Sequence, residues 1–120
     1  MKTILVKSGI RELSLFENSG FSFYEAYISF NDKLEKLLET NMSLRVIHMP
    51  SSIEVDGVEE PLNFNSNKSQ KDIIYKKLNQ IISFSEKHEV DYIVIHLGFF
   101  NIYDENIIRR KTNLKLRVYE

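Results

Sequence analysis

The sequence predicts an α/β protein with a parallel β-sheet, and three features of the chain lead to that prediction. Residues 92–95 (Y-I-V-I) form a short apolar run rich in β-branched side chains, which is typical of a strand buried on both faces. Residues 44–50 (L-R-V-I-H-M-P) repeat the pattern of an apolar strand that ends in a histidine. Segments with helical spacing lie between the predicted strands, and this alternation implies parallel pairing with right-handed crossovers.

The first part of the chain is expected to hold two strands and two short helices. Residues 3–8 read as a strand and residues 10–18 as a helix, although L-S-L-F within 10–18 also suits a strand. The apolar side of that helix would hold Ile10, Leu13 and either Phe16 or Leu15. Residues 21–29 (F-S-F-Y-E-A-Y-I-S) have strand composition, with Glu25 in the middle. A helix over 32–40 would follow, with a cap at Asn31, an end at Asn41 and a buried stripe of Leu34, Leu37 and Leu38.

The second half is expected to hold the remaining elements. A long connection from Pro50 to about residue 68 contains Asp56-Gly57, the dipeptide favoured in tight hairpin turns. Its acidic residues are interpreted as solvated charge rather than metal ligands; they are Glu54, Asp56, Glu59 and Glu60. A helix starts at Ser69 with Asp72 as a capping box. Its buried stripe would be Ile74, Leu78, Ile81 and Ile82, widened by Ile73 and Phe84, and its polar face Lys76, Lys77, Asn79 and Gln80. A helix from Asp104 and a strand over 114–120 complete the order.

Composition narrows the class of protein. The length of 120 residues predicts one domain over 1–120, and 42% hydrophobic with 28% charged residues is an ordinary globular balance. A net charge of -1 argues against a general nucleic-acid or membrane-surface binder. The absence of cysteine excludes disulfides and thiolate sites. The apolar run at the N-terminus is too short for a signal peptide or membrane span, so we expect a cytoplasmic protein.

His48 and His96 are the strongest candidate site residues. Each ends an apolar strand, and the C-terminal ends of parallel strands are where α/β folds place their chemistry. If the two strands are neighbours in register, both histidines point to the same side at the same height. A single strand-end histidine is commonly an ordinary core residue, but two in matching positions favour a functional role. Glu25 is either a solvated edge residue or a site-facing carboxylate, because burying it alone would be costly.

Four motifs, spread over roughly residues 20–100, resemble the N-terminal half of the sugar phosphate isomerase/epimerase family. They are F-Y-E-A-Y-I-S on the second strand, V-I-H-M-P on the third, the segment L-N-F-N-S-N-K-S-Q-K-D, and V-I-H-L-G on the fourth. The family consists of xylose-isomerase-like (β/α)8 TIM barrels and their relatives, which include apurinic-site endonucleases. A full barrel needs about 250 residues. The resemblance therefore implies a truncated barrel, a half barrel of four to five strands.

The resemblance also implies a metal and a substrate class. His48 and His96 would help to bind a divalent metal ion (Mn, Zn, Mg or Co) or flank the substrate. Glu120 is the candidate for the metal-binding glutamate that ends the family's fifth strand. The substrate would be a small sugar or sugar phosphate, from which a proton is transferred next to a carbonyl with a cation stabilising the enediolate. Glu25, if it faces inward, would orient a histidine or bind substrate hydroxyls as a catalytic residue.

Two other functions stay open at this point. The first is phosphodiester cleavage at apurinic sites, which shares the same motifs but needs basic loops around the groove. The second is a non-catalytic half barrel that serves as an assembly module. In either case, a half barrel would leave two strand edges and an inner apolar wall uncovered at Val46 and Val94, so we expect a homo-oligomer. Contact between the basic segment 109–117 and the acidic loop 54–60 of a partner would fit such an assembly.

Overall fold

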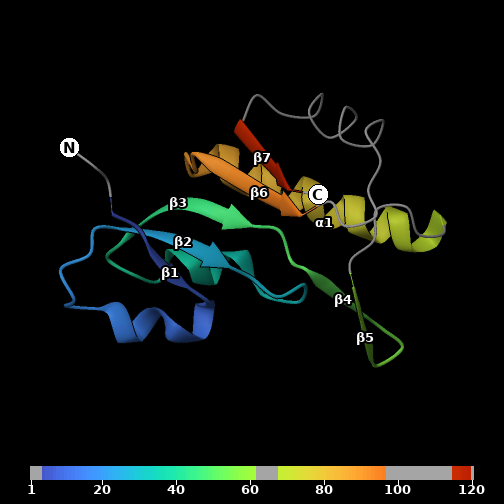
Figure 1. Ribbon diagram of the computed structural model, residues 1–120, viewed down its shortest axis with the longest axis horizontal. Helices are drawn as coiled ribbons and strands as arrows, with labels where there is room; N and C mark the ends of the chain where they lie inside the picture. Colours follow the sequence, from blue (N-terminus) through green and yellow to red (C-terminus); the bar gives the residue numbers. More distant parts are fainter. Residues whose placement is uncertain (1–3, 62–67, 97–114, 120) are drawn as a thin grey trace.

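A computed structural model describes residues 4–61, 68–96 and 115–119 of the chain. Its elements follow one another in the order strand, 3-10 helix, strand, 3-10 helix, strand, hairpin, α-helix, strand and strand (Figure 1). Their bounds are β1 Val6–Ser8, η1 Ile10–Phe16, β2 Phe23–Tyr27, η2 Leu34–Leu38, β3 Ser43–His48, β4 Ser52–Val55, β5 Val58–Pro61, α1 Lys68–Lys87, β6 Tyr92–His96 and β7 Lys115–Tyr119. The predicted helix from Asp104 falls outside the described residues.

The sheet is parallel throughout and confirms the predicted α/β class. Its strand order is β1-β2-β3-β6-β7, so each new strand of the sheet is added beside the previous one. The four strands β1, β2, β3 and β6 therefore place their C-terminal ends along one edge, with β7 beside β6. Between β3 and α1 the chain forms the separate antiparallel hairpin β4–β5, which projects from the sheet (Figure 1).

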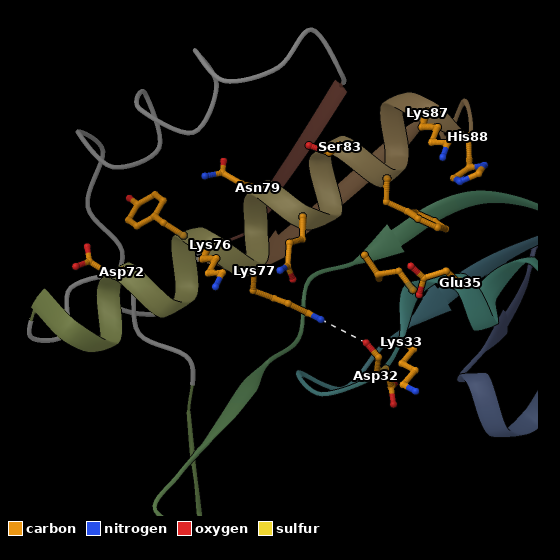
Figure 2. A pocket seen from close by; sticks show the side chains of 14 residues that line it. Asp32, Lys33, Glu35, Asp72, Lys76, Lys77, Asn79, Ser83, Lys87 and His88 are labelled. Atoms are coloured by element: carbon orange, nitrogen blue, oxygen red, sulfur yellow. Dashed lines mark hydrogen bonds between the residues drawn. The ribbon is translucent and has the colours of Figure 1, made fainter.

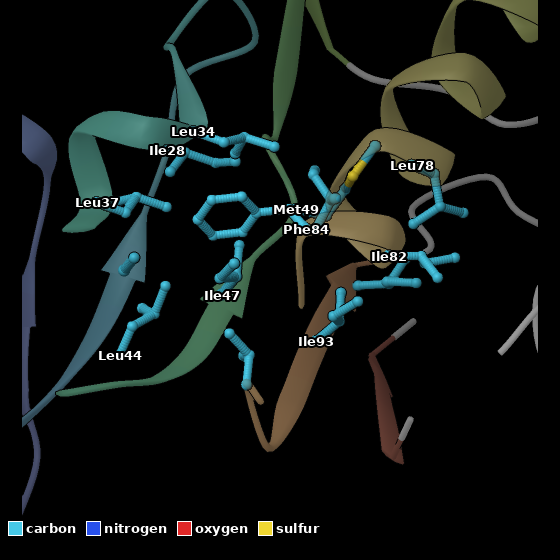
Figure 3. Packing of buried hydrophobic residues seen from close by; sticks show 14 of the residues in the cluster. Ile28, Leu34, Leu37, Leu44, Ile47, Met49, Leu78, Ile82, Phe84 and Ile93 are labelled. Atoms are coloured by element: carbon cyan, nitrogen blue, oxygen red, sulfur yellow. The ribbon is translucent and has the colours of Figure 1, made fainter. Parts of the chain in front are cut away.

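One face of the sheet packs against the helices and forms the hydrophobic core. The strands contribute fully buried side chains such as Tyr24, Ile47 and Ile93, and α1 contributes Leu78 and its neighbours (Figure 3). Leu13 of η1 and Leu34 and Leu37 of η2 belong to the same cluster. The buried hydroxyl of Tyr24 donates a hydrogen bond to the carbonyl oxygen of Leu37, which satisfies both polar groups inside the core.

A β-bulge in β3 changes which of its residues face the core. Tyr24 pairs with Leu44, but the next residue, Glu25, pairs with Val46, so Arg45 has no partner on β2. In a regular strand the alternation of side chains predicts that Leu44, Val46 and His48 share one face, and the bulge makes this wrong for Leu44. Leu44 packs in the helix-side core cluster, whereas Val46 and His48 take the register of Glu25 and Tyr27. We call the surface formed by Lys7, Glu25, Tyr27, Val46 and His48 the Glu25 face.

Asp91 contacts the bulged Arg45 in two ways. Its backbone N–H donates to the Arg45 carbonyl at 2.9 Å, and its carboxylate accepts a hydrogen bond from the Arg45 Nε at 2.5 Å. The guanidinium also lies 4.8 Å from the centre of the Phe23 ring. These contacts fix the backbone and the side chain of the extra residue, so the bulge is supported from the start of β6 as well as from β2.

Both short predicted helices are 3-10 helices. In η1, Leu13 is buried and Ile10 and Phe16 pack against the core, which is the three-residue spacing of a 3-10 turn. In η2 the same spacing buries Leu34 and Leu37 but leaves Leu38 exposed, so the predicted third member of the stripe is wrong. The predicted caps of η2 are also wrong: Lys33 precedes its first turn and Glu39 follows its last, in place of Asn31 and Asn41.

The hairpin and α1 agree with the sequence in most respects. Asp56 and Gly57 both have positive φ angles, 50° and 80°, as a type I′ turn requires. The predicted stripe of α1 is buried at Ile74, Leu78, Ile81, Ile82 and Phe84. Two residues of α1 depart from the prediction. Ile73 is exposed, and Lys77, placed on the polar face, is buried because it lies three residues after Ile74 and four before Ile81. The helix also begins at Lys68, one residue before the predicted cap at Ser69.

The Glu25 face is better covered than a half barrel would suggest. Val46 is only 7% exposed and Val94 only 3% exposed within the single chain. The expectation of an uncovered apolar wall is therefore wrong at these two positions. The exposed large hydrophobic side chains lie elsewhere, at Leu15, Phe21, Val58 and Ile73 among others.

Candidate functional site

Glu25 and His48 form a direct contact between neighbouring strands. Glu25 lies in the middle of β2, His48 ends β3, and the Glu25 Oε1 and His48 Nε2 atoms are 2.6 Å apart. The side chains are 17% and 12% exposed, respectively, so the pair is largely shielded from water. A carboxylate–imidazole hydrogen bond in such surroundings is stronger than one at the surface. Glu25 is therefore not a solvated edge residue, because β2 lies between β1 and β3 and the carboxylate is largely buried against His48. Its role in a site stays a prediction.

Tyr27 and Lys7 extend this pair toward the C-terminal edge of the sheet. The Tyr27 ring stacks on the His48 ring with centres 4.0 Å apart and an angle of 17° between the planes. The Lys7 ammonium lies 5.8 Å from the centre of the Tyr27 ring. Hydrogen bonding to Tyr27, together with the nearby negative charge of Glu25, raises the pKa of Lys7 above its ordinary value.

Tyr27 and Lys7 are not among the predicted site residues, although the sequence pattern contains a signal for each. Tyr27 follows Glu25 by two residues and therefore shares its face of the strand. Lys7 follows the apolar run I-L-V in the first strand, and the register places it opposite Glu25.

A cleft of about 730 Å³ lies next to these residues. Lys7, Tyr27, Arg11, Ser29 and Asn31 are among its lining residues, and they come from the C-terminal ends of β1 and β2 and from the segments that follow. Clefts outside the carboxyl ends of parallel strands are the usual binding places in α/β proteins. The cleft offers room for a small polar molecule, but Glu25 and His48 are not among its lining residues, and it meets the pair only through the neighbouring Lys7 and Tyr27.

His96 is only partly placed by the structure. Its strand, β6, is parallel to β3 and adjacent to it, as predicted. The register pairs His48 with Val94, so the backbone of His96 lies two residues farther along, about 6.6 Å at the rise of a parallel strand. The expectation of equal height is wrong, because it assumed that matching sequence positions occupy matching levels. The side chain of His96 is outside the described residues, and its predicted role stays a prediction.

The predicted metal set is incomplete in the described part of the chain. Glu25 and His48 are two potential donors, whereas catalytic zinc sites take three protein ligands. Among residues 4–61, 68–96 and 115–119, no group of three or more histidine and carboxylate side chains is arranged to hold a metal ion. Glu120 lies outside the described residues. The register of β7 pairs Leu116 with Ile93 and Val118 with Ile95. Ile93 and Ile95 belong to the core cluster, so these two positions of β7 are aligned with core residues of β6 and not with the Glu25 face.

Three of the four hairpin acids are exposed, as expected for solvated charges, whereas Glu60 is half-buried. Glu54, Asp56 and Glu59 are exposed. Glu59 accepts a hydrogen bond from Ser52 at 2.6 Å, and Glu60 accepts one from Gln70 at 3.1 Å. These contacts connect the hairpin strands to each other and to the start of α1.

No protein-family model, curated protein or solved structure matches this chain. Within the described ranges, none of the helices is both long enough and apolar enough to cross a membrane. Function must therefore be inferred from the parallel α/β sheet and from the Glu25–His48 pair near its C-terminal edge.

Proposed function

We propose that this chain provides the proton-transferring part of an isomerase- or epimerase-like (β/α) barrel that acts on a small sugar or sugar phosphate. The observation that carries the proposal is the 2.6 Å contact between Glu25 and His48 on adjacent parallel strands. A shielded carboxylate beside an imidazole is a combination that suits proton transfer at neutral pH. The cleft lined by Tyr27 and Lys7 is the proposed place for the substrate, whose reacting carbon would have to reach past these two side chains to Glu25.

The proposed chemistry assigns a different task to each group. Glu25 removes a proton from the carbon next to the substrate carbonyl, and His48 holds the carboxylate in position through its Nε2 atom. The Tyr27 ring fixes the plane of the imidazole by stacking. The Lys7 ammonium places positive charge near the negative oxygen that develops as the proton leaves.

A divalent metal ion is a separate component of the proposal. When bound, it would supply charge stabilisation for an enediolate. Glu25 and His48 by themselves do not complete its ligand set, so the metal would depend on His96 and Glu120 as well. The proton-transfer step above uses only the described residues and does not require that set.

Hydrogen exchange at carbon tests the proposed step. The chain is incubated in D2O with a panel of aldose and ketose sugars and their phosphates, with and without Mn²⁺, and loss of the proton next to the carbonyl is followed by NMR. We expect Glu25→Gln to slow this exchange by about 100-fold or more, because positioned acid–base groups contribute that much. Glu39→Gln, which changes an exposed carboxylate at the end of η2, is the matched control and should leave the rate unchanged. An exchange rate that is the same in Glu25→Gln would contradict the proposal.

An assembly module is the second candidate function. It is favoured by the topology, in which β1 and β7 are the outermost strands of the described sheet. Unpaired strand edges are natural places for association. Light scattering at micromolar concentration tests this candidate, and a compact monomer would count against it.

Cleavage at apurinic sites ranks below both. The hairpin carries exposed Glu54, Asp56 and Glu59, which would repel the phosphate backbone of DNA. Cleavage of a duplex with one abasic site would reverse this ranking.

A further inference from the structure

A groove runs between η2 and α1 on the helix side of the sheet, away from the Glu25 face. Its walls come from residues 32–35, at the start of the 5-residue η2, and from one side of the 20-residue α1. The groove has a volume of about 910 Å³ and is lined by Leu34, Tyr75 and Phe84 together with polar side chains of both elements (Figure 2). Its wall is therefore partly apolar and partly charged.

Lys77 is the most unusual group in this groove. Its side chain extends from α1 toward Asp32, as Figure 2 shows, and the residue is only 9% exposed. The ammonium has three protons to donate, but in the described part of the chain its one hydrogen bond is a 3.4 Å contact to the backbone oxygen of Asp32. The Phe30 ring lies 5.8 Å from the Nζ atom.

The charge of Lys77 is poorly compensated. No carboxylate among the described residues lies within ion-pair distance of its Nζ atom. Burial accordingly lowers the pKa of Lys77, and the more distant charges of Asp32 and Glu35 oppose that shift only in part. Buried cations in proteins are normally paired, so this one indicates a missing anionic partner.

The surroundings add further positive charge. Lys33, Lys76 and Lys87 also line the groove and are exposed, and none of them forms an ion pair with a described carboxylate. Asp32, Glu35 and Asp72 are the acids that line it. Of these, the Asp32 carboxylate already accepts a hydrogen bond from the Ser29 backbone at 2.7 Å.

We propose that this groove binds an organic anion, with a phosphate or carboxylate group on Lys77 and an apolar body against Leu34 and Phe84. The anion would supply the counter-charge that Lys77 lacks, and Lys76 and Lys33 would contact it from either side. Charge-assisted hydrogen bonds of this kind are roughly twice as strong as hydrogen bonds between neutral groups. The site is separate from the Glu25–His48 pair, and the inference does not depend on the proposed function.

NMR of the full chain carrying lysine labelled with ¹³C at Cε tests the inference. Phenyl phosphate is the probe, because it combines a phosphate with an aromatic body. We expect a saturable shift of the Lys77 signal, and no saturable shift with phenol, which lacks the anionic group. Binding to the variants is followed on the signals of Lys33 and Lys76, which also line the groove. Lys77→Met should weaken binding by about 10-fold or more, since one charge-assisted hydrogen bond is worth at least that factor. Lys77→Arg, which keeps the charge, should retain most of the affinity.

Lys36→Gln is the matched control. Lys36 is an exposed lysine of η2 that pairs with Glu39 and does not line the groove, so its replacement should leave the affinity within about 2-fold, as for most surface changes. Far-UV circular dichroism verifies that each variant is folded. The inference would be overturned by a Lys77→Met variant that binds phenyl phosphate as tightly as the unmodified chain. Equal binding of phenol, or equal shifts of all lysine signals, would overturn it as well.

Discussion

Replacing Lys77 by methionine should make the protein more stable. The substitution keeps an unbranched side chain of similar volume against the core but removes the ammonium. Replacing a buried ion pair by apolar groups of similar volume is often neutral or stabilising by about 1–4 kcal/mol, and we expect the same sign for a buried charge without an ion-pair partner. Lys77 belongs in the lower part of that range, because its ammonium end lines a groove that water can enter.

The interactions that this substitution removes are weak. The hydrogen bond to the Asp32 oxygen is long, at 3.4 Å, and a typical bond contributes about 1 kcal/mol or less. The net expectation is a rise of about 1–2 kcal/mol in the free energy of unfolding, at the lower end of the range for buried charges. For a chain of this size, each kcal/mol corresponds to an increase in Tm of roughly 3–6 °C.

Urea unfolding followed by circular dichroism at pH 7 measures the change, since the chain has no tryptophan for fluorescence. Lys36→Met is the control, because it makes the same chemical change at an exposed position and should alter stability by less than about 0.5 kcal/mol. A Lys77→Met variant that unfolds at lower urea concentration with an unchanged m-value would refute the reasoning. That result would mean that the interactions of the ammonium outweigh the cost of burying it.

Three further predictions follow from the same structure. Because burial lowers the pKa of Lys77, the unfolded chain binds this proton more tightly, so stability should rise with pH up to the ordinary value of 10.5. The advantage of Lys77→Met should therefore shrink in urea titrations between pH 7 and 10.5, and a constant advantage would contradict the linkage. Tyr24→Phe removes the hydrogen bond to the buried Leu37 carbonyl and should cost about 1–2 kcal/mol in the same assay, whereas no measurable change would mean that water or another donor replaces the hydroxyl. If a metal binds, His48→Ala and His96→Ala should each weaken it by at least ~10–100-fold in calorimetric titrations with Mn²⁺ and Zn²⁺ while the helical content stays unchanged. Absence of binding to the unmodified chain would end the metal hypothesis.

The strands and the hairpin can be predicted because local sequence determines them. Apolar β-branched runs define β3 and β6, and Asp56-Gly57 defines the hairpin turn through the backbone angles that these residues tolerate. The buried stripe of α1 follows from helical spacing for the same reason. The prediction for Lys77 fails because it followed residue type: lysine usually lies on the polar face of a helix, but position 77 falls on the buried stripe of α1.

The site can be predicted only in part. The sequence identifies both Glu25 and His48 as candidates, but it does not predict that they touch. It leaves the orientation of Glu25 open and pairs His48 with His96 instead. Their direct contact depends on the register between β2 and β3, which alternation within each strand does not determine. The sequence also does not reveal that the two short helices are 3-10 helices. In η2, Leu37 and Leu38 are equally apolar, and only the tighter turn decides which of them is buried.

The bulge at Arg45 gives β3 one residue more than its pairing with β2 requires. The face that a side chain takes alternates with every residue of a regular strand, so the site depends on how many paired residues separate Leu44 from His48. Deleting Arg45 would leave Leu44 opposite Tyr24 and Val46 opposite Glu25, and His48 would still meet Glu25. Inserting a residue between Val46 and His48 would instead turn the imidazole toward the helix side of the sheet. In a library of length variants selected for the Glu25–His48 contact, variants that lack codon 45 should therefore be retained, and variants with an insertion after codon 46 should be lost. That outcome would show that β3 can lose Arg45 without moving His48 away from Glu25.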